Sequence, residues 1–79
     1  MQSLDPSSIL GWCVYILRCA DGTLYSGCTV SLPRRLSAHG KGRAKYTRSR
    51  RPVVLVYAEE VPDRSAALRR EAALKRLSR

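Results

Sequence analysis

The sequence predicts an α+β fold, in which helices flank a small, mostly antiparallel sheet of three strands in the order β-β-α-β-α. Two runs of apolar, β-forming residues, at 12–19 and 53–58, predict two of the strands. A turn signal, Asp21-Gly22, followed by a further run at 23–28, predicts that the first two strands form an antiparallel hairpin. Two segments in which apolar residues recur at helical spacing predict the two helices.

The first half of the chain begins with a polar stretch. Residues 1–11 contain Asp5-Pro6-Ser7-Ser8, so we expect a flexible lead-in before a single domain over residues 12–79. The strand that begins at Trp12 is apolar on both sides, which is typical of a buried strand. Ser31 is in place to cap a helix that ends near Gly40, and one face of this helix carries Leu32, Leu36 and His39.

The second half begins with a basic loop, because residues 40–51 have no hydrophobic period. Pro52 then precedes a third strand, Val53–Ala58, which is again apolar on both faces and is therefore expected to be buried. Asp63 is placed to cap a second helix, whose core-facing residues are expected to be Ala67, Leu74 and Leu77.

The charge of the chain is the first indication of its function. Among its 79 residues, 15 are Lys or Arg and 6 are Asp or Glu, which gives a net charge of +9. A long basic run contains no acid at all: Arg34, Arg35, Lys41, Arg43, Lys45, Arg48, Arg50 and Arg51. Such a run repels itself and attracts polyanions, so we predict a nucleic-acid partner. The alternative partner is an anionic membrane surface or an acidic protein. The membrane alternative is weakened because no basic helix carries a Trp or Phe that could insert into lipid.

The sequence also indicates a cytoplasmic protein, associated with the nucleoid. Its longest apolar runs are far shorter than the ~20 residues of a membrane span, and its N-terminus does not have the pattern of a signal peptide. Cys13, Cys19 and Cys28 lack the paired spacing of a zinc site, even with His39. We therefore expect buried thiols in a reducing compartment.

Glu71 is the one acid among the basic residues of the last helix. Helical geometry places it at the edge of the apolar stripe, where the carboxylate is partly withdrawn from water. It can pair with Lys75 one turn further on, which would make it a structural residue. It can also bind an arginine or a metal ion, and both interpretations stay open on spacing alone.

Four other residues have ordinary structural explanations when each is taken alone. Tyr15 and Tyr25 fit core aromatics on adjacent strands, His39 fits a core histidine, and Arg35 fits a solvated arginine. Together with Glu71, and in this order, they form a set that resembles the GIY-YIG endonuclease superfamily, particularly its short stand-alone bacterial members. The resemblance covers residues 12–79 and includes the triplets 13–15 and 25–27 and the segments 14–19, 44–48 and 67–71.

The resemblance implies a metal-dependent endonuclease of the β-β-α-β-α type that hydrolyses DNA phosphodiester bonds with one divalent ion, Mg²⁺ or Mn²⁺. Glu71 then matches the metal ligand, Arg35 the residue that stabilises charge on the scissile phosphate, and His39 a contact to the nucleophile or phosphate. Tyr15 and Tyr25 match the motif tyrosines, one of which is the general base. Charge assigns DNA contacts to the rest of the basic run: Arg34, Lys41, Arg43, Lys45, Arg48, Arg50 and Arg51.

The expected substrate is branched, flapped or duplex DNA, cut with structural or weak selectivity in repair or recombination. A tyrosine with an ordinary pKa near 10 must be shifted downward by nearby cations to act as a base near pH 7. Cys13-Val14 replaces Gly-Ile in the first triplet, Ser26 replaces Ile in the second, and Cys28 occupies a place where some branches carry lysine. A catalytically idle nucleic-acid-binding module, or an adaptor whose partner protein selects the substrate, remains an alternative.

Overall fold

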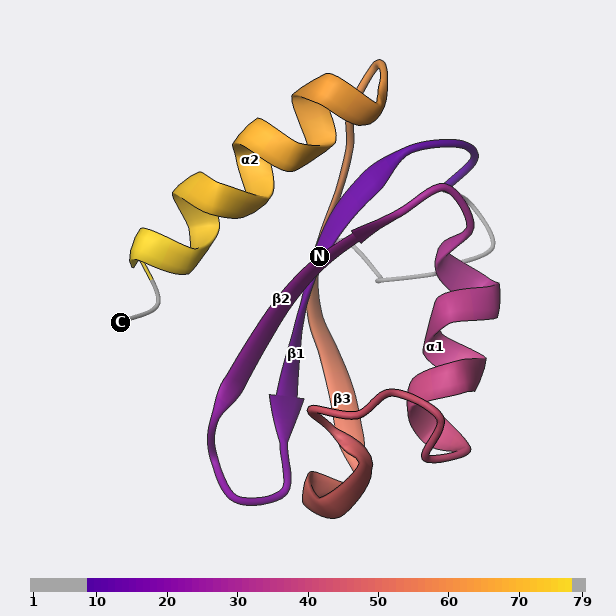
Figure 1. Ribbon diagram of the computed structural model, residues 1–79, viewed down its shortest axis with the longest axis vertical. Helices are drawn as coiled ribbons and strands as arrows, with labels where there is room; N and C mark the ends of the chain where they lie inside the picture. The colour runs from indigo at the N-terminus through magenta and orange to yellow at the C-terminus, as the bar shows by residue number, and fades with distance from the viewer. Residues whose placement is uncertain (1–8, 78–79) are drawn as a thin grey trace, which may run out of the picture.

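The structure, a computed structural model, describes residues 9–77 and has the predicted α+β architecture (Figure 1). Its elements in chain order are β1 (Cys13–Cys19), β2 (Leu24–Thr29), α1 (Leu32–Gly40), the short 3-10 helix η2 (Arg48–Arg50), β3 (Val53–Glu60) and α2 (Arg64–Leu77). Of the predicted lead-in, residues 1–8 lie outside the described part, and Ile9 packs against the core. No helix in the described part is long and apolar enough to cross a membrane.

The sheet has the strand order β2-β1-β3, and β1 pairs antiparallel with both neighbours. The register places Tyr15 of β1 opposite Gly27 of β2 and Ala58 of β3. An irregularity in the β1–β3 pairing lies between Ile16 and Leu17. The antiparallel hairpin predicted from Asp21-Gly22 is therefore confirmed, and the central strand is the most buried one.

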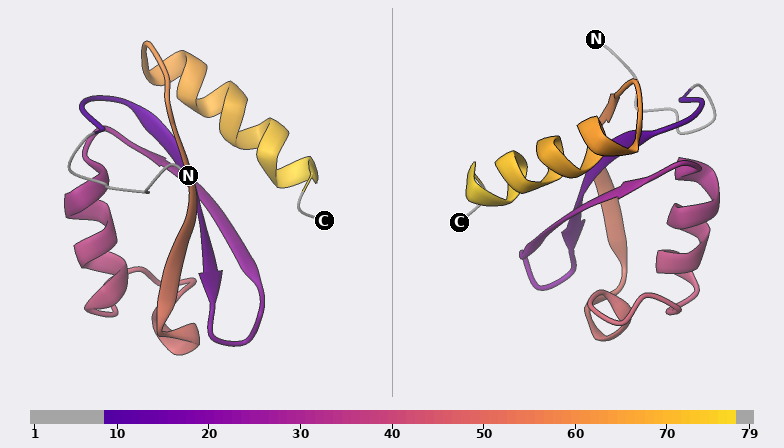
Figure 2. Two further views of the ribbon diagram at one scale, coloured as in Figure 1. Left: turned by 180° about the vertical axis from the view of Figure 1, so that it is seen from behind. Right: turned by 45° about the horizontal axis from the view of Figure 1, so that its top comes forward.

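Each helix covers one face of the sheet, as the front and rear views show (Figures 1 and 2). Successive side chains of β1 alternate between the two faces. On the α1 side, Tyr15 and Leu17 pack with Leu32 of the helix. On the α2 side, Val14 packs with Ala67 and other residues of that helix. The single small core is therefore divided by β1 into two halves.

Two expectations about the helix ends have different outcomes. Asp63 caps α2 as predicted, because its Oδ1 accepts a hydrogen bond from the backbone N–H of Ala66 at 2.8 Å. Ser31 occupies the N-cap position of α1, but its side chain makes no capping bond. Thr29 holds this residue instead, since its Oγ1 accepts from the Ser31 N–H at 3.1 Å. The hydroxyl of Thr29, at the end of β2, therefore fixes the residue at which α1 begins.

The burial of β3 differs from the prediction. Val54 and Val56 are 51% and 39% exposed, whereas the apolar run predicted burial on both faces. The reason is topological, because β3 is an edge strand and α2 lies over β1 and β2. The prediction for α2 holds for Ala67 and Leu74, which are buried, and the side chain of Leu77 lies outside the described part.

Candidate active site

Tyr15 lies at the centre of the site, on the middle strand and fully buried. Its hydroxyl accepts a hydrogen bond from Nε of Arg35 at 3.3 Å and lies 3.1 Å from Nε2 of His39. Both partners come from α1, where their i, i+4 spacing places them on neighbouring turns. The structure therefore brings three of the predicted site residues into direct contact.

Gly27 makes room for this tyrosine. It is the residue directly opposite Tyr15 in the pairing of β1 with β2. A Cβ at Gly27 would lie 2.6 Å from the Tyr15 hydroxyl oxygen and 2.7 Å from the ring carbon that carries it. Real Cβ atoms do not approach other atoms so closely, so the position requires glycine for a packing reason rather than a backbone one.

Thr47 is a site residue that the sequence analysis missed. It is fully buried, and its Oγ1 lies 2.6 Å from Nδ1 of His39, which is also fully buried. His39 thus contacts Tyr15 through one ring nitrogen and Thr47 through the other. Thr47 belongs to the segment 44–48, which the sequence places in the basic loop and in the family resemblance without giving Thr47 a role. No hydrophobic period predicts that Thr47 is buried. The one available signal is its place in a segment that resembles the GIY-YIG family.

Tyr25 completes an aromatic cluster that extends toward the surface. Its ring centroid lies 6.3 Å from that of Tyr15 and 5.2 Å from that of His39. On its other side it contacts Tyr46, also at 5.2 Å, and Tyr46 is 44% exposed. The guanidinium of Arg50 lies over the Tyr46 ring, 4.4 Å from the centroid. The cluster therefore links the buried tyrosine to the exposed basic loop.

Glu71 reaches the site from the other helix. Its side chain is only 17% exposed and forms an ion pair with Lys75 at 3.2 Å, so the structural pairing predicted for it is present. Burial and the nearby Glu71 carboxylate raise the pKa of the Cys28 thiol. Within the described residues no hydrogen bond joins Glu71 to Tyr15, but its charge contributes to the pKa of that tyrosine. Glu71 thus acts on Tyr15 through its charge rather than through a hydrogen bond.

The environment shifts the titration of both central groups. Burial raises the pKa of Tyr15 to about 12, against a smaller lowering by the Arg35 guanidinium. In the protein alone, desolvation thus outweighs the lowering by Arg35, and the downward shift that a base near pH 7 needs stays a prediction. Burial and the charge of Arg35 lower the pKa of His39, so this imidazole is neutral at pH 7.

In the structure the basic loop covers residues 41–51, because Gly40 is the last residue of α1, and it is held at several points. Arg51 donates from Nε to the Arg48 carbonyl at 3.0 Å and from Nη1 to the Gly40 carbonyl at 3.2 Å. Arg50 forms an ion pair with Asp21 at 3.5 Å, and its carbonyl accepts from the Ala20 N–H at 2.9 Å. The predicted DNA-contacting residues on the exposed surface are Arg34, Lys41, Arg43, Lys45, Arg48 and Arg51, whereas Arg50 is half-buried.

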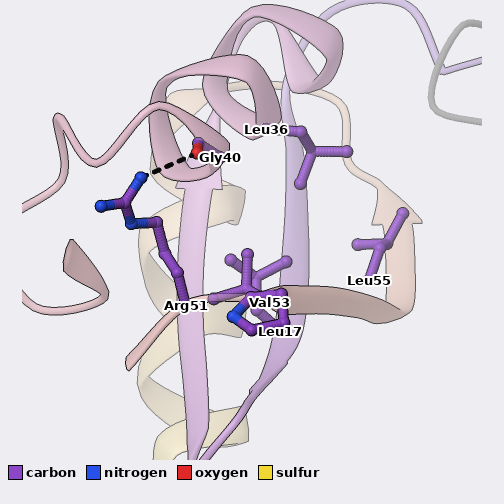
Figure 3. Close-up of a pocket in the computed structure, with 7 residues that line it drawn as sticks. Leu17, Leu36, Gly40, Arg51, Val53 and Leu55 are labelled. Atoms are coloured by element: carbon purple, nitrogen blue, oxygen red, sulfur yellow. Dashed lines mark hydrogen bonds between the residues drawn. The ribbon is translucent and has the colours of Figure 1, made fainter. Parts of the chain in front are cut away.

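A separate apolar pocket of about 440 Å³ opens between α1, the last part of β1 and the start of β3 (Figure 3). Its lining includes Leu17, Leu36, Gly40, Arg51, Val53 and Leu55. None of the five predicted catalytic residues lines it. Its one charged group is Arg51, which is already bonded to the Gly40 carbonyl. The pocket therefore does not belong to the polar cluster around Tyr15.

Comparisons with known proteins agree with the predicted family. The model of the GIY-YIG catalytic domain matches residues 11–79. A UPF0213 protein of Desulfotalea psychrophila is 56% identical over 69 residues, which are 85% of this chain and 63% of that protein. The chain thus spans less than two thirds of the length of that relative. A UPF0213 protein of Syntrophus aciditrophicus is 54% identical over 68 residues, 84% of this chain and 78% of that protein.

The fold also has a counterpart among solved structures. The solution NMR structure of a UPF0213 protein from Bacillus halodurans matches with a TM-score of 0.54 and 45% sequence identity. The match covers 86% of this chain and 73% of that chain. The similarity therefore extends over most of the chain rather than over one motif.

Proposed function

The chain belongs to the GIY-YIG catalytic domain family, and from this premise we propose that it is a metal-dependent endonuclease that hydrolyses DNA phosphodiester bonds. Family membership indicates nuclease activity in general terms. The finer proposal is cleavage of branched, flapped or duplex DNA, with structural or weak selectivity, in repair or recombination. The observation that carries it is the buried Tyr15 hydroxyl, which lies against the Arg35 guanidinium and the His39 imidazole.

Each residue of the cluster has a role that suits its chemistry. Arg35 uses Nε for Tyr15, and its remaining guanidinium N–H groups suit the oxygens of a scissile phosphate. The exposed cations of the basic loop suit the flanking phosphates of the DNA backbone. Tyr15 is proposed as the group that handles the proton of the attacking water, with Tyr25 packed beside it and His39 as its hydrogen-bond partner.

Glu71 is the residue proposed to hold the divalent ion. Mg²⁺ binds through one or two carboxylates and completes its octahedral shell with water and substrate phosphate. Glu71 offers one partly buried carboxylate, and the described residues contain no group of three or more His, Cys, Asp or Glu that would form a closed metal site. A single-carboxylate site therefore fits Mg²⁺ or Mn²⁺. When bound, such an ion would neutralise charge on the phosphate and acidify water.

The test replaces the charge of Glu71 without changing its size. We expect Glu71→Gln to abolish Mg²⁺-dependent nicking of a panel of branched, flapped and plain duplex DNA. DNA affinity measured in chelator at several salt concentrations should stay equal or rise, because a negative charge near the phosphate is removed. Glu59→Gln is the matched control, since Glu59 is also a partly buried glutamate in an ion pair, with Arg70 at 3.0 Å. It should leave nicking unchanged.

Three outcomes decide between the candidates. Full nicking activity in Glu71→Gln would refute the metal assignment. DNA binding without nicking by the parent protein, in both Mg²⁺ and Mn²⁺, would support the catalytically idle binding module. Nicking that begins only when a second protein is added would support the adaptor.

A further inference from the structure

His39 is the only histidine of the chain, and both of its ring nitrogens have a hydroxyl partner in the buried cluster. At neutral pH it is uncharged, so one nitrogen carries a proton and the other accepts one. Two arrangements satisfy the ring. Either Tyr15 donates to Nε2 while Nδ1 donates to Thr47, or Thr47 donates to Nδ1 while Nε2 donates to Tyr15.

The two distances decide between these arrangements. Hydrogen bonds donated by N–H groups to oxygen are usually about 2.7–3.2 Å long, whereas hydroxyl donors reach shorter distances, about 2.5–3.0 Å to oxygen. The contact between Thr47 Oγ1 and Nδ1 is 2.6 Å, which fits a hydroxyl donor. The contact between Nε2 and the Tyr15 oxygen is 3.1 Å, which fits an N–H donor. The opposite arrangement would require an N–H group to donate to the Thr47 oxygen at 2.6 Å, which is shorter than the usual N–H···O distance.

We propose that Thr47 is a positioning residue, which donates its hydroxyl proton to Nδ1 of His39 and so keeps the imidazole proton on Nε2, aimed at the Tyr15 oxygen. The catalytic meaning of this assignment rests on the proposed nuclease function, but the assignment itself concerns the free protein. Thr47 acts only through His39 and is not itself a catalytic residue.

The consequence falls on Tyr15. Its oxygen receives one hydrogen bond from Nε of Arg35 and a second from Nε2 of His39. Two donors that converge on one oxygen favour the phenolate over the neutral phenol, and they oppose the desolvation that disfavours charge. His39 is then a donor that prepares Tyr15 for negative charge, and not the base that removes the tyrosine proton.

The backbone holds Thr47 in the required place. The N–H of Arg48 donates to the carbonyl of the buried Ala44 at 3.0 Å, and the N–H of Arg50 donates to the Thr47 carbonyl at 2.9 Å. These bonds form the turn that leads into η2 and direct Thr47 inward, between two exposed neighbours, Tyr46 and Arg48. The basic loop thereby contributes a buried residue to the site as well as its surface charges.

The first test reads the tautomer directly, in chelator and without DNA. The ¹⁵N chemical shifts of a protonated and an unprotonated imidazole nitrogen differ widely, and the chain has one histidine to observe. We expect the proton on Nε2, with Nδ1 unprotonated and hydrogen-bonded. Tyr15→Phe should move the Nε2 shift by removing its acceptor. A proton found on Nδ1 in the parent protein would overturn the proposal.

The second test uses variants of Thr47. Thr47→Val keeps the shape but removes the donor, so it should shift the His39 ¹⁵N signals toward a mixture of tautomers, and Thr47→Ser should restore the parent spectrum. The pH profile of nicking should move to higher pH in Thr47→Val, because the Tyr15 oxygen loses part of its support. The other groups that influence this oxygen, Arg35, Tyr25 and Glu71, are unchanged in the variant.

The outcomes separate this proposal from the proposed function. Unchanged ¹⁵N signals in Thr47→Val would show that Thr47 only fills space and would overturn the positioning role, whatever the protein does to DNA. A protein that never nicks DNA but shows the expected tautomer would refute the nuclease proposal alone. If Thr47→Val fails to fold, the parent spectrum and the spectra of Thr47→Ser and Tyr15→Phe still decide the assignment.

Discussion

The two faces of β1 differ in what they bury. On the α1 face, Tyr15 packs among polar groups, including His39 and Thr47, which are fully buried and bonded to one another or to the tyrosine. On the α2 face, Val14 packs against apolar residues of the helix, such as Ala67. Adjacent residues of one strand thus face opposite environments. The α1 face thus combines a buried polar cluster with apolar packing, whereas the packing around Val14 on the α2 face is apolar.

The comparison extends to one buried hydroxyl on each side. Thr47 on the α1 side has a partner at 2.6 Å. Ser26, which pairs with Ile16 on the α2 side, is 4% exposed, and its Oγ has no hydrogen-bond partner in the described part of the chain. A buried hydroxyl without a partner costs free energy, whereas a bonded one does not. We therefore expect the buried hydroxyl of Thr47 to stabilise the fold and the buried hydroxyl of Ser26 to destabilise it.

The largest effect should come from crowding the α1 face. Gly27→Ala places a methyl group against the buried Tyr15 hydroxyl, so the ring must move away from Arg35 and His39. We expect nicking to fall about 100-fold, as for other small misplacements of catalytic groups, and the free energy of unfolding to fall by about 1–3 kcal/mol from overpacking. Nicking rates and thermal unfolding measure the two effects.

The matched control for this change is Gly40→Ala. Gly40 lies at the end of α1, and a Cβ there would meet no atom within 4 Å. It should leave nicking and the melting temperature almost unchanged. Equal losses in the two variants would mean that glycine matters for backbone freedom, and that the close approach of Gly27 to Tyr15 has no special role.

An intermediate effect should appear in the dependence of stability on pH. Tyr15 has a folded pKa of about 12 against 10.0 when unfolded, so the unfolded chain ionises first and stability falls as pH rises from 10 toward 12. The full difference corresponds to roughly 3 kcal/mol. His39 has a folded pKa below 6.5, so the unfolded chain binds the proton more readily and stability also falls as pH drops below 6.5.

Urea unfolding across this pH range measures the decline of stability at alkaline pH and the decline at acid pH. Tyr15→Phe should remove the part of the alkaline decline that Tyr15 causes, and it should leave the decline of stability at acid pH unchanged. An alkaline decline of the same size in Tyr15→Phe would contradict the assignment. Part of the alkaline decline should remain in this variant, because the pKa values of Cys28 and Tyr57 on the α2 face are also raised.

The smallest effect should come from the α2 face, and with the opposite sign. Ser26→Ala removes the unpartnered hydroxyl and should raise the free energy of unfolding by about 1 kcal/mol. For a domain of this size that change raises the melting temperature by about 4–8 °C. Nicking should be unaffected. A loss of stability would reveal that the Ser26 hydroxyl has a partner in solution, for example a bound water.

Much of the fold could be predicted because its signals are local. The hairpin follows from Asp21-Gly22, and the cap of α2 follows from Asp63. The exposure of Val54 and Val56 could not, because an apolar strand shows its composition but not its place at the edge of a sheet. The candidate site shows the same limit. The spacing of Arg35 and His39 indicates a shared helix surface, whereas the contact with Thr47 depends on how a loop without periodicity folds back over α1.

The anchoring of the basic loop has a consequence for the entropy of binding. The C-terminal end of the loop is bonded to Gly40 through Arg51 and to the β1–β2 turn through Arg50. In the middle of the loop, the buried Thr47 is hydrogen-bonded to His39 of α1. A loop that is already ordered gives up little backbone freedom when DNA binds. The remaining cost is that of the long cationic side chains, about 0.5–1.5 kcal/mol for each one that becomes immobile. Most of the electrostatic attraction of this small domain for phosphate is then available as affinity.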